Sequence, residues 1–507
     1  MFQGLIAFGH SLAGFMTVES IFYVLASTLV GVVIGALPGL TATMGVALMT
    51  TLTLKLPSAQ ALLILICTYV GAIYGGSRSA ILLNIPGTPA SAASCLDGYA
   101  LARQGMAGRA MGIATSGSVL GTLIGMFFLA LFTPLLGDVA LKFGAYEFFW
   151  LAVFGVIISA TLTGGDPLKG WITGFAGLFI ATIGQDGIHA FDRFSFGVHD
   201  LTGGISLVPA LVGAFGFAEI LVAMQEKRPP VKINALDSVI PKLRDVFQYW
   251  RTILRSGVIG TFIGIVPGVG EDVAAWSSYA AAKRASKEKE QFGKGSVEGL
   301  MAAETGDNAC VPGAIIPVLT LQVPGSAPAA VLMAAMLIHG VKPGPMIMIE
   351  SPQFVYDIVA MMMLATIGIL IYGLTLTKFL VQVLRVPTTI IVPIIMVLCT
   401  IGTFALASRL FDIWVMVAFG LIGFALRKYG YPMAPLVLGI VLGDLLEKNL
   451  RRGLVLSDGD LSPFFTRPIA GFMAATILLV IVLRMPAVRR LFSRRAPDGA
   501  RTPSTPP

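Results

Sequence analysis

Charged residues are scarce in this sequence: Asp, Glu, Lys and Arg make up 12% of its 507 residues, about half of the ~25% that is usual in soluble domains. Histidine occurs four times and never as H-E-x-x-H, and the chain contains neither a Walker A lysine motif nor a G-x-S-x-G elbow. These absences argue against a soluble protein, a zinc hydrolase, an ATP-driven transporter and a serine hydrolase.

Cysteine is also rare. Its four copies stand singly in or beside apolar segments without C-x-x-C spacing, at Cys67, Cys95, Cys310 and Cys399. This placement favours reduced side chains that pack, rather than disulfides or metal ligands. No Lys or Arg precedes Lys55, so the charged start of a secretory signal peptide is missing and the first helix is expected to stay in the mature protein.

Apolar residues, in contrast, make up 56% of the chain and gather in runs long enough to cross the ~30 Å hydrocarbon core of a bilayer as helices. The sequence therefore predicts an all-α polytopic membrane protein. The net charge of +8 lies at the edges of apolar runs, which favours positive-inside topology over nucleic-acid binding. The predicted spans are 21–37, 112–132, 148–162, 171–183, 205–224, 354–377, 388–407, 413–426 and 469–483.

Two Pro-Gly signatures occur twice in the same order. Residues 31–39, Gly-Val-Val-Ile-Gly-Ala-Leu-Pro-Gly, match 260–268, Gly-Thr-Phe-Ile-Gly-Ile-Val-Pro-Gly. Residues 84–88, Asn-Ile-Pro-Gly-Thr, match 322–326, Gln-Val-Pro-Gly-Ser. Interrupted apolar helices in corresponding positions of two halves point to a substrate site near the membrane midplane. The paired breaks therefore predict a transporter with discontinuous helices.

A third match joins residues 208–213 to 434–439, and the three offsets are 229, 238 and 226 residues. Ordered matches with small length differences indicate an internal duplication. The predicted organisation is a first transmembrane repeat over 1–224, a cytoplasmic linker over 225–255, a second repeat over 256–447, and a loop, final helix and basic cytoplasmic tail over 448–507.

The basic residues suggest that the two repeats are inverted in the membrane. Cytoplasmic loops collect Lys and Arg, which places the linker and the tail inside. Counting the spans back from the linker and from the tail places two loops outside: the loop 186–200 and the loop after residue 446. In the first repeat, the segment that corresponds to the loop after residue 446 is the cytoplasmic linker. Corresponding segments therefore lie on opposite sides of the membrane. Three basic residues disagree, because they would then be external: Lys448, Arg451 and Arg452.

The segment 257–282 begins after one basic stretch and ends at another. Both ends therefore look cytoplasmic, which favours a re-entrant hairpin with residues 267–270 at its tip. A single kinked crossing is the alternative. Irregular backbone at membrane depth is tolerated where protein or a wet cavity satisfies its polar groups.

A Pro-Gly break opens a new helix whose first N–H groups lack partners and carry partial positive charge. A carboxylate would be stabilised there without a buried lysine, and nearby hydroxyls and amides could add hydrogen bonds. Close helix packing is the alternative role of the Gly-x-x-x-Gly pairs. The predicted substrate-binding residues are Pro38, Gly39, Thr41, Thr43, Asn84, Pro86, Gly87, Thr88, Ser91, Pro267, Gly268, Gly270, Pro324, Gly325 and Ser326.

Five polar residues are candidates for binding a coupling ion. Glu271 and Asp272 directly follow a break, where capping of the new helix is an equally good role. Glu304, Asp307 and Asn308 form an oxygen-rich cluster that suits Na⁺ or a proton relay, with a solvated hairpin as the alternative placement. No cofactor is predicted, and no metal beyond Na⁺.

Several further residues have predicted roles outside the breaks. Arg78 could pair with a substrate carboxylate, and Asp444, near a helix end, is interpreted as a pairing or interface charge. The methionines at 361–363 are predicted to face lipid or neighbouring helices. Surface positions are predicted for three residues near a cytoplasmic loop: Asp97, Arg103 and Arg109.

These motifs resemble TctA, the large membrane subunit of the tripartite tricarboxylate transporter family. The resemblance covers nearly the whole chain and is carried in the first half by residues 35–39, 74–77, 81–91 and 96–99. In the second half it is carried by residues 274–279, 323–327, 338–345, 449–452 and 457–462.

The resemblance implies a permease of the bacterial inner membrane that uses a Na⁺ or H⁺ gradient to import di- or tricarboxylates, with citrate as one possibility. It implies two partners, a TctB-like small membrane subunit and a TctC-like periplasmic binding protein, and an elevator-like movement of the broken helices. Arg78, Asp307 and Asp444 depart from the family pattern, which leaves the substrate open. A membrane-embedded enzyme and a passive anion channel are the alternative functions.

Overall fold

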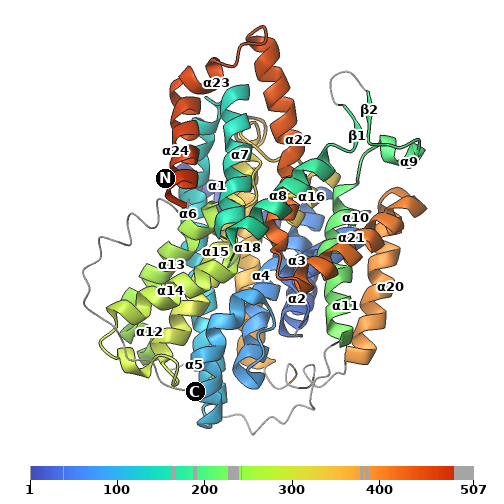
Figure 1. Ribbon diagram of the computed structural model, residues 1–507. Coiled ribbons are helices and arrows are strands. Elements are labelled where there is room, and N and C mark those ends of the chain that lie inside the picture. Colours follow the sequence, from blue (N-terminus) through green and yellow to red (C-terminus); the bar gives the residue numbers. More distant parts are fainter. Residues whose placement is uncertain are drawn as a thin grey trace, which may run out of the picture.

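The structure is a computed structural model (Figure 1) that describes residues 2–484 except 38, 163–165, 187–190, 226–238, 241–242, 377–378, 380–381 and 383–387. The described residues are almost entirely helical, with one two-stranded antiparallel ladder between β1 and β2. The prediction of an all-α polytopic membrane protein is confirmed.

The elements before the linker are α1 (Phe2–Gly14), α2 (Val18–Ala36), α3 (Ala42–Leu52), α4 (Ser58–Leu83), η1 (Pro89–Ser91), α5 (Ala92–Arg103), α6 (Ala107–Ala140), α7 (Ala145–Leu162), α8 (Pro167–Ala181), β1 (Gly184–Gln185), β2 (Asp192–Arg193), α9 (His199–Thr202), α10 (Leu207–Leu211), the π-helical η2 (Val212–Phe217) and α11 (Ala218–Gln225).

The later elements are α12 (Leu243–Gln248), α13 (Trp250–Ile265), α14 (Gly270–Ala285), η3 (Lys289–Gln291), α15 (Val297–Leu321), α16 (Ala327–Ile338), α17 (Ile347–Glu350), α18 (Phe354–Thr375), α20 (Thr388–Ala407), α21 (Leu410–Lys428), α22 (Met433–Leu456), α23 (Pro463–Thr466) and α24 (Pro468–Arg484).

Large apolar side chains remain exposed on the outer helices. On α6, Phe127, Leu131 and Leu135 recur every four residues and expose 56%, 45% and 55% of their surface. Residues at this spacing share one helix face, and a contiguous apolar face of this kind marks contact with lipid or a partner. Among the described helices, five are long and apolar enough to cross a membrane: α2, α4, α6, α18 and α21.

The two innermost helices are α4 and α15. Every residue of α4 from Ala61 to Leu82 is buried, and so is every residue of α15 from Gly299 to Thr320. Neither helix is among the spans predicted from sequence. Both carry polar residues within their apolar runs, which lowers the hydropathy signal that identifies spans. Their polar groups therefore lie at the centre of the protein, away from lipid.

Each duplicated Gly-x-x-x-Gly pair marks a close crossing of two helices. A Cβ atom at Gly31 or Gly35 of α2 would overlap backbone carbonyls of α4, at Thr68 and Ala72. A Cβ atom at Gly260 or Gly264 of α13 would likewise overlap the carbonyls of Gly306 and Cys310 on α15. These glycines serve helix packing, and α2 lies on α4 as α13 lies on α15.

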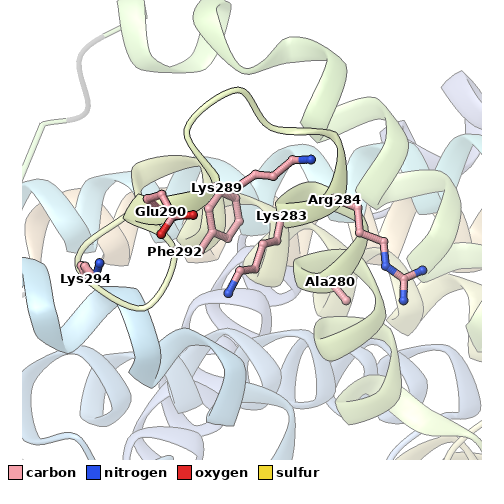
Figure 2. A pocket seen from close by; sticks show the side chains of 7 residues that line it. All are labelled: Ala280, Lys283, Arg284, Lys289, Glu290, Phe292 and Lys294. Carbon is pink, nitrogen blue, oxygen red and sulfur yellow. The ribbon is translucent and has the colours of Figure 1, made fainter. Parts of the chain in front are cut away.

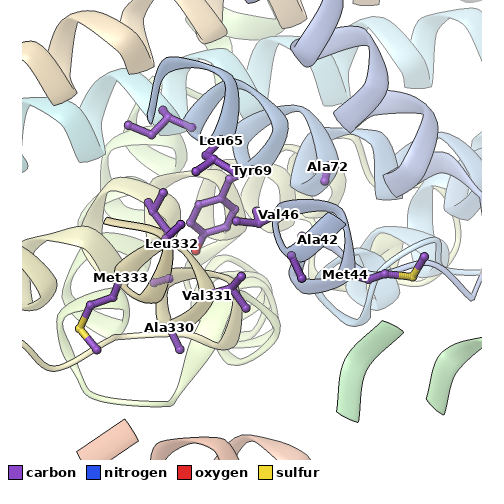
Figure 3. Packing of buried hydrophobic residues seen from close by; sticks show 14 of the residues in the cluster. Ala42, Met44, Val46, Leu65, Tyr69, Ala72, Ala330, Val331, Leu332 and Met333 are labelled. Carbon is purple, nitrogen blue, oxygen red and sulfur yellow. The ribbon is translucent and has the colours of Figure 1, made fainter. Parts of the chain in front are cut away.

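The segments that follow the first breaks have different paths. Helices α13 and α14 pack side by side around residues 266–269, so this segment is a helical hairpin and not a single kinked helix. Helix α3 packs mainly between α4 and α16. Figure 3 shows this packing, with Val46 of α3, Tyr69 of α4 and Leu332 of α16 gathered in one apolar cluster.

Ion pairs join distant segments at opposite ends of the molecule (Figure 1). At one end, Arg451 contacts Asp186 at 2.7 Å, and Arg193 contacts Glu447 at 2.5 Å. At the other end, Arg109 at the start of α6 contacts Asp245 of α12 at 3.0 Å. Asp186, Arg193 and the end of α22 thus lie on one side, as the topology prediction requires. Acidic partners also balance Arg451, one of the three basic residues that disagreed with that prediction.

The duplication, the inversion and the elevator movement stay predictions. The third sequence match lies at the start of α10 and near the start of α22. The tail beyond residue 484 and residues 226–238 and 241–242 of the linker lie outside the described residues.

Candidate functional site

Within each half, the second Pro-Gly break packs against the first. A Cβ atom at Gly87 would overlap the carbonyl of Gly35, and one at Gly325 would overlap the carbonyl of Gly264. The Gly87 N–H donates to the Gly76 carbonyl at 3.2 Å, and the Gly325 N–H donates to the Ala314 carbonyl at 3.3 Å. Gly87 and Gly76 lie 238 residues before Gly325 and Ala314, and Gly35 lies 229 residues before Gly264, which are the offsets of the two duplicated signatures. The two break units therefore have matching contacts.

Left-handed residues end the central helices at these breaks. Asn84 caps α4 with φ of 57° and Gln322 caps α15 with φ of 58°, a conformation that costs Asn least among ordinary residues. The turns at Gly39 and Gly268 also have positive φ, of 86° and 68°. Pro38 lies outside the described residues.

Hydroxyls predicted to bind substrate also cap the new helices. Thr41 accepts a hydrogen bond from the Met44 N–H at 3.2 Å, and Ser326 accepts one from the Ala329 N–H at 3.4 Å. Ser91 accepts from the Thr88 N–H at 3.3 Å. Thr43 is buried in the first turn of α3. These side chains therefore hold the helix N-termini in place, where an anion can approach the backbone.

The four breaks differ in exposure. Asn84 and Pro86 of the first half are exposed. In the second half, residues 267–271 and 323–326 are buried. The first-half turn thus reaches the surface at Asn84 and Pro86, while Gly87, Thr88 and Ser91 beside it are buried like the second-half breaks.

Tyr69 joins the two halves at the second-half breaks. Its hydroxyl, on α4, contacts the carboxylate of Glu271 at the start of α14 and lies 2.7 Å from the Ser326 hydroxyl that caps α16. Figure 3 shows its ring lying between α3 and α16. Sequence reasoning missed this residue. The available signal was a tyrosine within an apolar run, because a buried phenol usually finds a hydrogen-bond partner.

A second carboxylate lies deeper in the core. Glu304 of α15 is fully buried and accepts hydrogen bonds from Ser94 of α5 at 2.5 Å and Ser118 of α6 at 3.0 Å. The charge of Arg78 on α4 also acts on Glu304. The cluster is thus enclosed within the helix bundle, which excludes the solvated-hairpin alternative.

Asp307 and Asn308 lie one turn beyond Glu304 and are fully buried. The Asn308 amide donates to the Asp307 carboxylate at 2.8 Å and to the Glu304 backbone carbonyl at 3.1 Å. Within the described part of the chain, Asp307 Oδ2 and Asn308 Oδ1 have no hydrogen-bond partner. The predicted ion-coupling residues of α15 therefore include two unsatisfied buried oxygens.

Comparison with known proteins identifies the family of this protein. Residues 21–438 match the model of the tripartite tricarboxylate transporter TctA family. The chain belongs to the TctA family. It is a component of a tripartite tricarboxylate transporter and a multi-pass membrane protein.

Two curated relatives come from Agrobacterium vitis. This TctA-family chain is 36% identical over 476 residues, 94% of its own length and 95% of the relative's, to an uncharacterized 52.8 kDa protein in the TAR-I ttuC' 3' region. It is 33% identical over 231 residues, 45% of its own length and 96% of the relative's, to an uncharacterized protein in the TAR-II ttuC' 3' region. No solved structure matches the chain.

The expected surface position of Asp97 in this TctA-family chain is wrong. Asp97 is fully buried at 0% exposure, and its carboxylate accepts hydrogen bonds from the N–H groups of Gly293, Gly295 and Ser296 at 2.8–2.9 Å. Tyr279 donates to it as well, at 2.9 Å. Asp97 therefore fastens α5 to the loop before α15, a contact between residues almost 200 positions apart that sequence spacing does not reveal.

Arg78 is held by the protein itself. It is fully buried, donates to Ser77 at 2.9 Å and to the Met111 carbonyl and Thr115 hydroxyl at 3.3 Å, and lies 4.3 Å from the centre of the Tyr74 ring. These contacts assign the guanidinium a role in supporting the core around Glu304. Its predicted pairing with substrate stays a prediction.

The remaining charged residues lie near the surface. Arg103 is exposed, as predicted, and Arg109 forms the ion pair with Asp245 described above. Asp444 is paired with Lys448 at 2.7 Å. Asp272 is half-buried in the first turn of α14.

The other packing predictions concern cysteine and methionine. The four cysteines are free. Met361 and Met362 are buried against neighbouring helices, and Met363 is partly buried. These side chains therefore serve packing, as predicted.

One cavity, of about 660 Å³, lies at the opposite end of α14 from Glu271 (Figure 2). It is lined by Ala280, Lys283, Arg284, Lys289, Glu290, Phe292 and Lys294. Since a helix rises about 1.5 Å per residue, the cavity is roughly 15 Å or more from the break. It is therefore separate from the paired breaks.

Proposed function

We propose that this chain is the permease subunit of a binding-protein-dependent system that imports a di- or tricarboxylate such as citrate, driven by a Na⁺ or H⁺ gradient. It would act in the bacterial inner membrane with a TctB-like small membrane subunit and a TctC-like periplasmic binding protein. The proposed role is transport without an enzymatic step.

One observation carries the proposal: the chain contains two break units with matching contacts, and Tyr69 of the first half contacts Glu271 and Ser326 at the breaks of the second. Each unit ends two helices and starts two others, so N-terminal backbone groups with partial positive charge meet near buried carboxylates. An anion and a cation can therefore be bound close together, which is what coupled transport requires.

In this proposal, the substrate carboxylates bind to backbone N–H groups and hydroxyls at the breaks, and the coupling ion binds near Glu271, Glu304, Asp307 and Asn308. Movement of the broken helices against the outer helices would expose the site to each side in turn. The first-half turn that reaches the surface at Asn84 and Pro86 and the buried second-half breaks support one such state.

The test is uptake of labelled di- and tricarboxylates into proteoliposomes that contain the permease with its small membrane subunit and receive the binding protein from outside. We expect accumulation above the external concentration under an inward Na⁺ or pH gradient, with loss of accumulation when the gradient is collapsed. Downhill flux alone would indicate a channel, and absence of flux for every carboxylate would refute the proposal.

A further inference from the structure

The strongest unexplained feature of the core is a carboxylic acid beside an amide. The Asn308 Nδ2 atom donates to Asp307 Oδ1 at 2.8 Å. The other oxygen of each group, Asp307 Oδ2 and Asn308 Oδ1, has no partner among the described residues, and both side chains are fully buried. Buried acceptors without donors are costly, so something that the protein groups do not supply must satisfy them.

The orientation of the Asn308 amide follows from its two hydrogen bonds. Its nitrogen donates to Asp307 Oδ1 and to the Glu304 backbone carbonyl, and a backbone carbonyl only accepts. A flipped amide would place its oxygen against the Glu304 carbonyl, so the free oxygen of Asn308 is correctly assigned whether or not Asp307 carries a proton.

A proton on Asp307 removes the cost of its free oxygen. If Asp307 Oδ2 carries a hydrogen, the buried acid is neutral and becomes a donor, and a neutral acid is far less costly to bury than a carboxylate. The neighbouring residue carries an unpartnered acceptor, Asn308 Oδ1.

The neighbouring carboxylates are in different surroundings. Glu304 accepts from two serine hydroxyls and feels the charge of Arg78, and Glu271 contacts the Tyr69 hydroxyl at a helix N-terminus. Both arrangements stabilise an ionised group. For Asp307 the only hydrogen-bond donor among the described side chains is the Asn308 amide. Carboxylates with such different partners take different protonation states.

An alkali cation fits the same atoms less well. Hard cations of this kind are surrounded by about six or more oxygens. Within residues 304–308 the unpartnered atoms are Asp307 Oδ2, Asn308 Oδ1 and the hydroxyl of Thr305, which lies three residues before Asn308 on the same side of α15. Three such atoms are fewer than a cation of this kind requires.

The groups that act electrostatically on this cluster come from several elements. They are Glu304 and Cys310 on α15, Tyr69, Tyr74 and Arg78 on α4, Cys95 on α5, and Glu271 and Asp272 on α14. With four carboxylates, Asp307 included, and one guanidinium in this region, an entering polyanion is repelled less when Asp307 is neutral.

We propose that Asp307 binds the coupling proton at its Oδ2 atom, the buried carboxylate oxygen without a partner among the described residues. This inference rests on the proposed ion-coupled transport and names its ion. The proton is taken from water on the uptake side and released to water on the other side with the carboxylate. The neutral form is the one that receives the substrate, so proton binding precedes carboxylate binding.

The first test is infrared spectroscopy of the purified full chain at neutral pH, and it requires no transport. We expect a carbonyl stretching band of a buried protonated carboxylic acid that is lost in Asp307→Asn. The control Glu290→Gln, in the exposed cavity at the end of α14, should keep the band. A wild-type band that Asp307→Asn leaves unchanged, or no such band in the wild type, would overturn the proposal.

The Asp307→Asn variant should fold, because Asn has the size of Asp and its amide oxygen can accept the Asn308 hydrogen bond that Oδ1 accepts in the wild type. In proteoliposomes we expect it to exchange carboxylate across the membrane but to lose accumulation driven by a pH gradient. Retained pH-driven accumulation would overturn the proposal. So would a melting temperature that rises with NaCl over equal KCl in the wild type but not in Asp307→Asn, because an alkali cation would then occupy the site.

Discussion

Single hydroxyls and carboxylates determine how the two halves of this transporter meet. Tyr69 is the clearest case, since one phenol on α4 contacts both Glu271 and Ser326 at the starts of α14 and α16. A second tyrosine five residues away, Tyr74, is equally buried but contacts Thr115 on α6 at 3.0 Å. Substituting each tyrosine in turn therefore separates two effects on transport: loss of the contacts at the breaks, and loss of a buried hydroxyl in general.

We predict that Tyr69→Phe lowers carboxylate uptake by about tenfold or more. Loss of a hydrogen bond to a buried carboxylate costs roughly 1.5–3 kcal/mol, and about 1.4 kcal/mol corresponds to a factor of ten. The measurement is initial uptake rate in proteoliposomes against substrate concentration.

Tyr74→Phe is the matched control, and its uptake should stay within about threefold of the wild type. Both variants need a melting curve in detergent to show that they fold. Equal losses of uptake in the two variants would mean that Tyr69 acts only through general stability.

At this scale the sequence predicts the breaks but not the contacts between them. Glu304, Asp307 and Asn308 could be selected because ionisable residues in apolar surroundings are expensive. Asp97 and Tyr69 could not, since their partners are nearly 200 or more residues distant. Whether a carboxylate is solvated or buried depends on the packing of other helices, which local pattern does not contain.

Among the elements, the pairs α2–α4 and α13–α15 depend on glycine. Without side chains at Gly35 and Gly264, the helix backbones touch, and the breaks that follow them are brought against each other. Close contact of this kind is the main source of helix association in lipid, where no hydrophobic driving force acts between helices.

We predict that Gly35→Val separates α2 from α4 and reduces both stability and uptake. The new side chain would collide with backbone of Ala72, which cannot move without displacing α4, and overpacking of this kind typically costs about 1–3 kcal/mol or more. Melting temperature in detergent and uptake in proteoliposomes measure the two effects.

Gly9→Val is the control, because a Cβ atom at Gly9 of α1 meets no atom within 4 Å. It should leave both quantities close to the wild-type values. A Gly35→Val variant as stable and active as Gly9→Val would show that the crossing tolerates a side chain.

Hydropathy separates the two innermost helices. Helix α4 is apolar enough to count as a candidate span although it carries Arg78, whereas α15, which carries Glu304 and Asp307, is not among the five candidate spans of the described residues. Both helices face protein on all sides, so their polar side chains can be satisfied by neighbouring helices. The helix that holds most of the ion-coupling candidates is therefore one that a hydropathy search does not detect.

For the molecule as a whole, the ion pairs at its two ends divide the loops into two sets. One set contains Asp186, Arg193, Glu447 and Arg451, and the other contains Arg109 and Asp245. The positive-inside argument places the first set outside the cell membrane and the second inside. The ion-pair contacts show which loops lie on the same side, and the distribution of Lys and Arg indicates which side faces the cytoplasm.

We predict that single cysteines at positions 230 and 500, which lie outside the described residues, react with an impermeant reagent only from the cytoplasm. A cysteine at Val455, which is 71% exposed, should react only from the periplasm. The background is a variant in which the four native cysteines are replaced by alanine. Labelling of position 455 from the cytoplasm would contradict the inverted arrangement.

The break contacts have a consequence for how tightly cargo is held. The Gly268 N–H already donates to the Pro324 carbonyl at 3.2 Å, and the Ser326 hydroxyl is already in contact with Tyr69. An arriving anion that takes these donors exchanges hydrogen bonds instead of adding them, and the net gain from such an exchange is small. The proposed permease should therefore bind its substrate weakly and release it quickly. High-affinity capture of the substrate would then be the task of a separate protein.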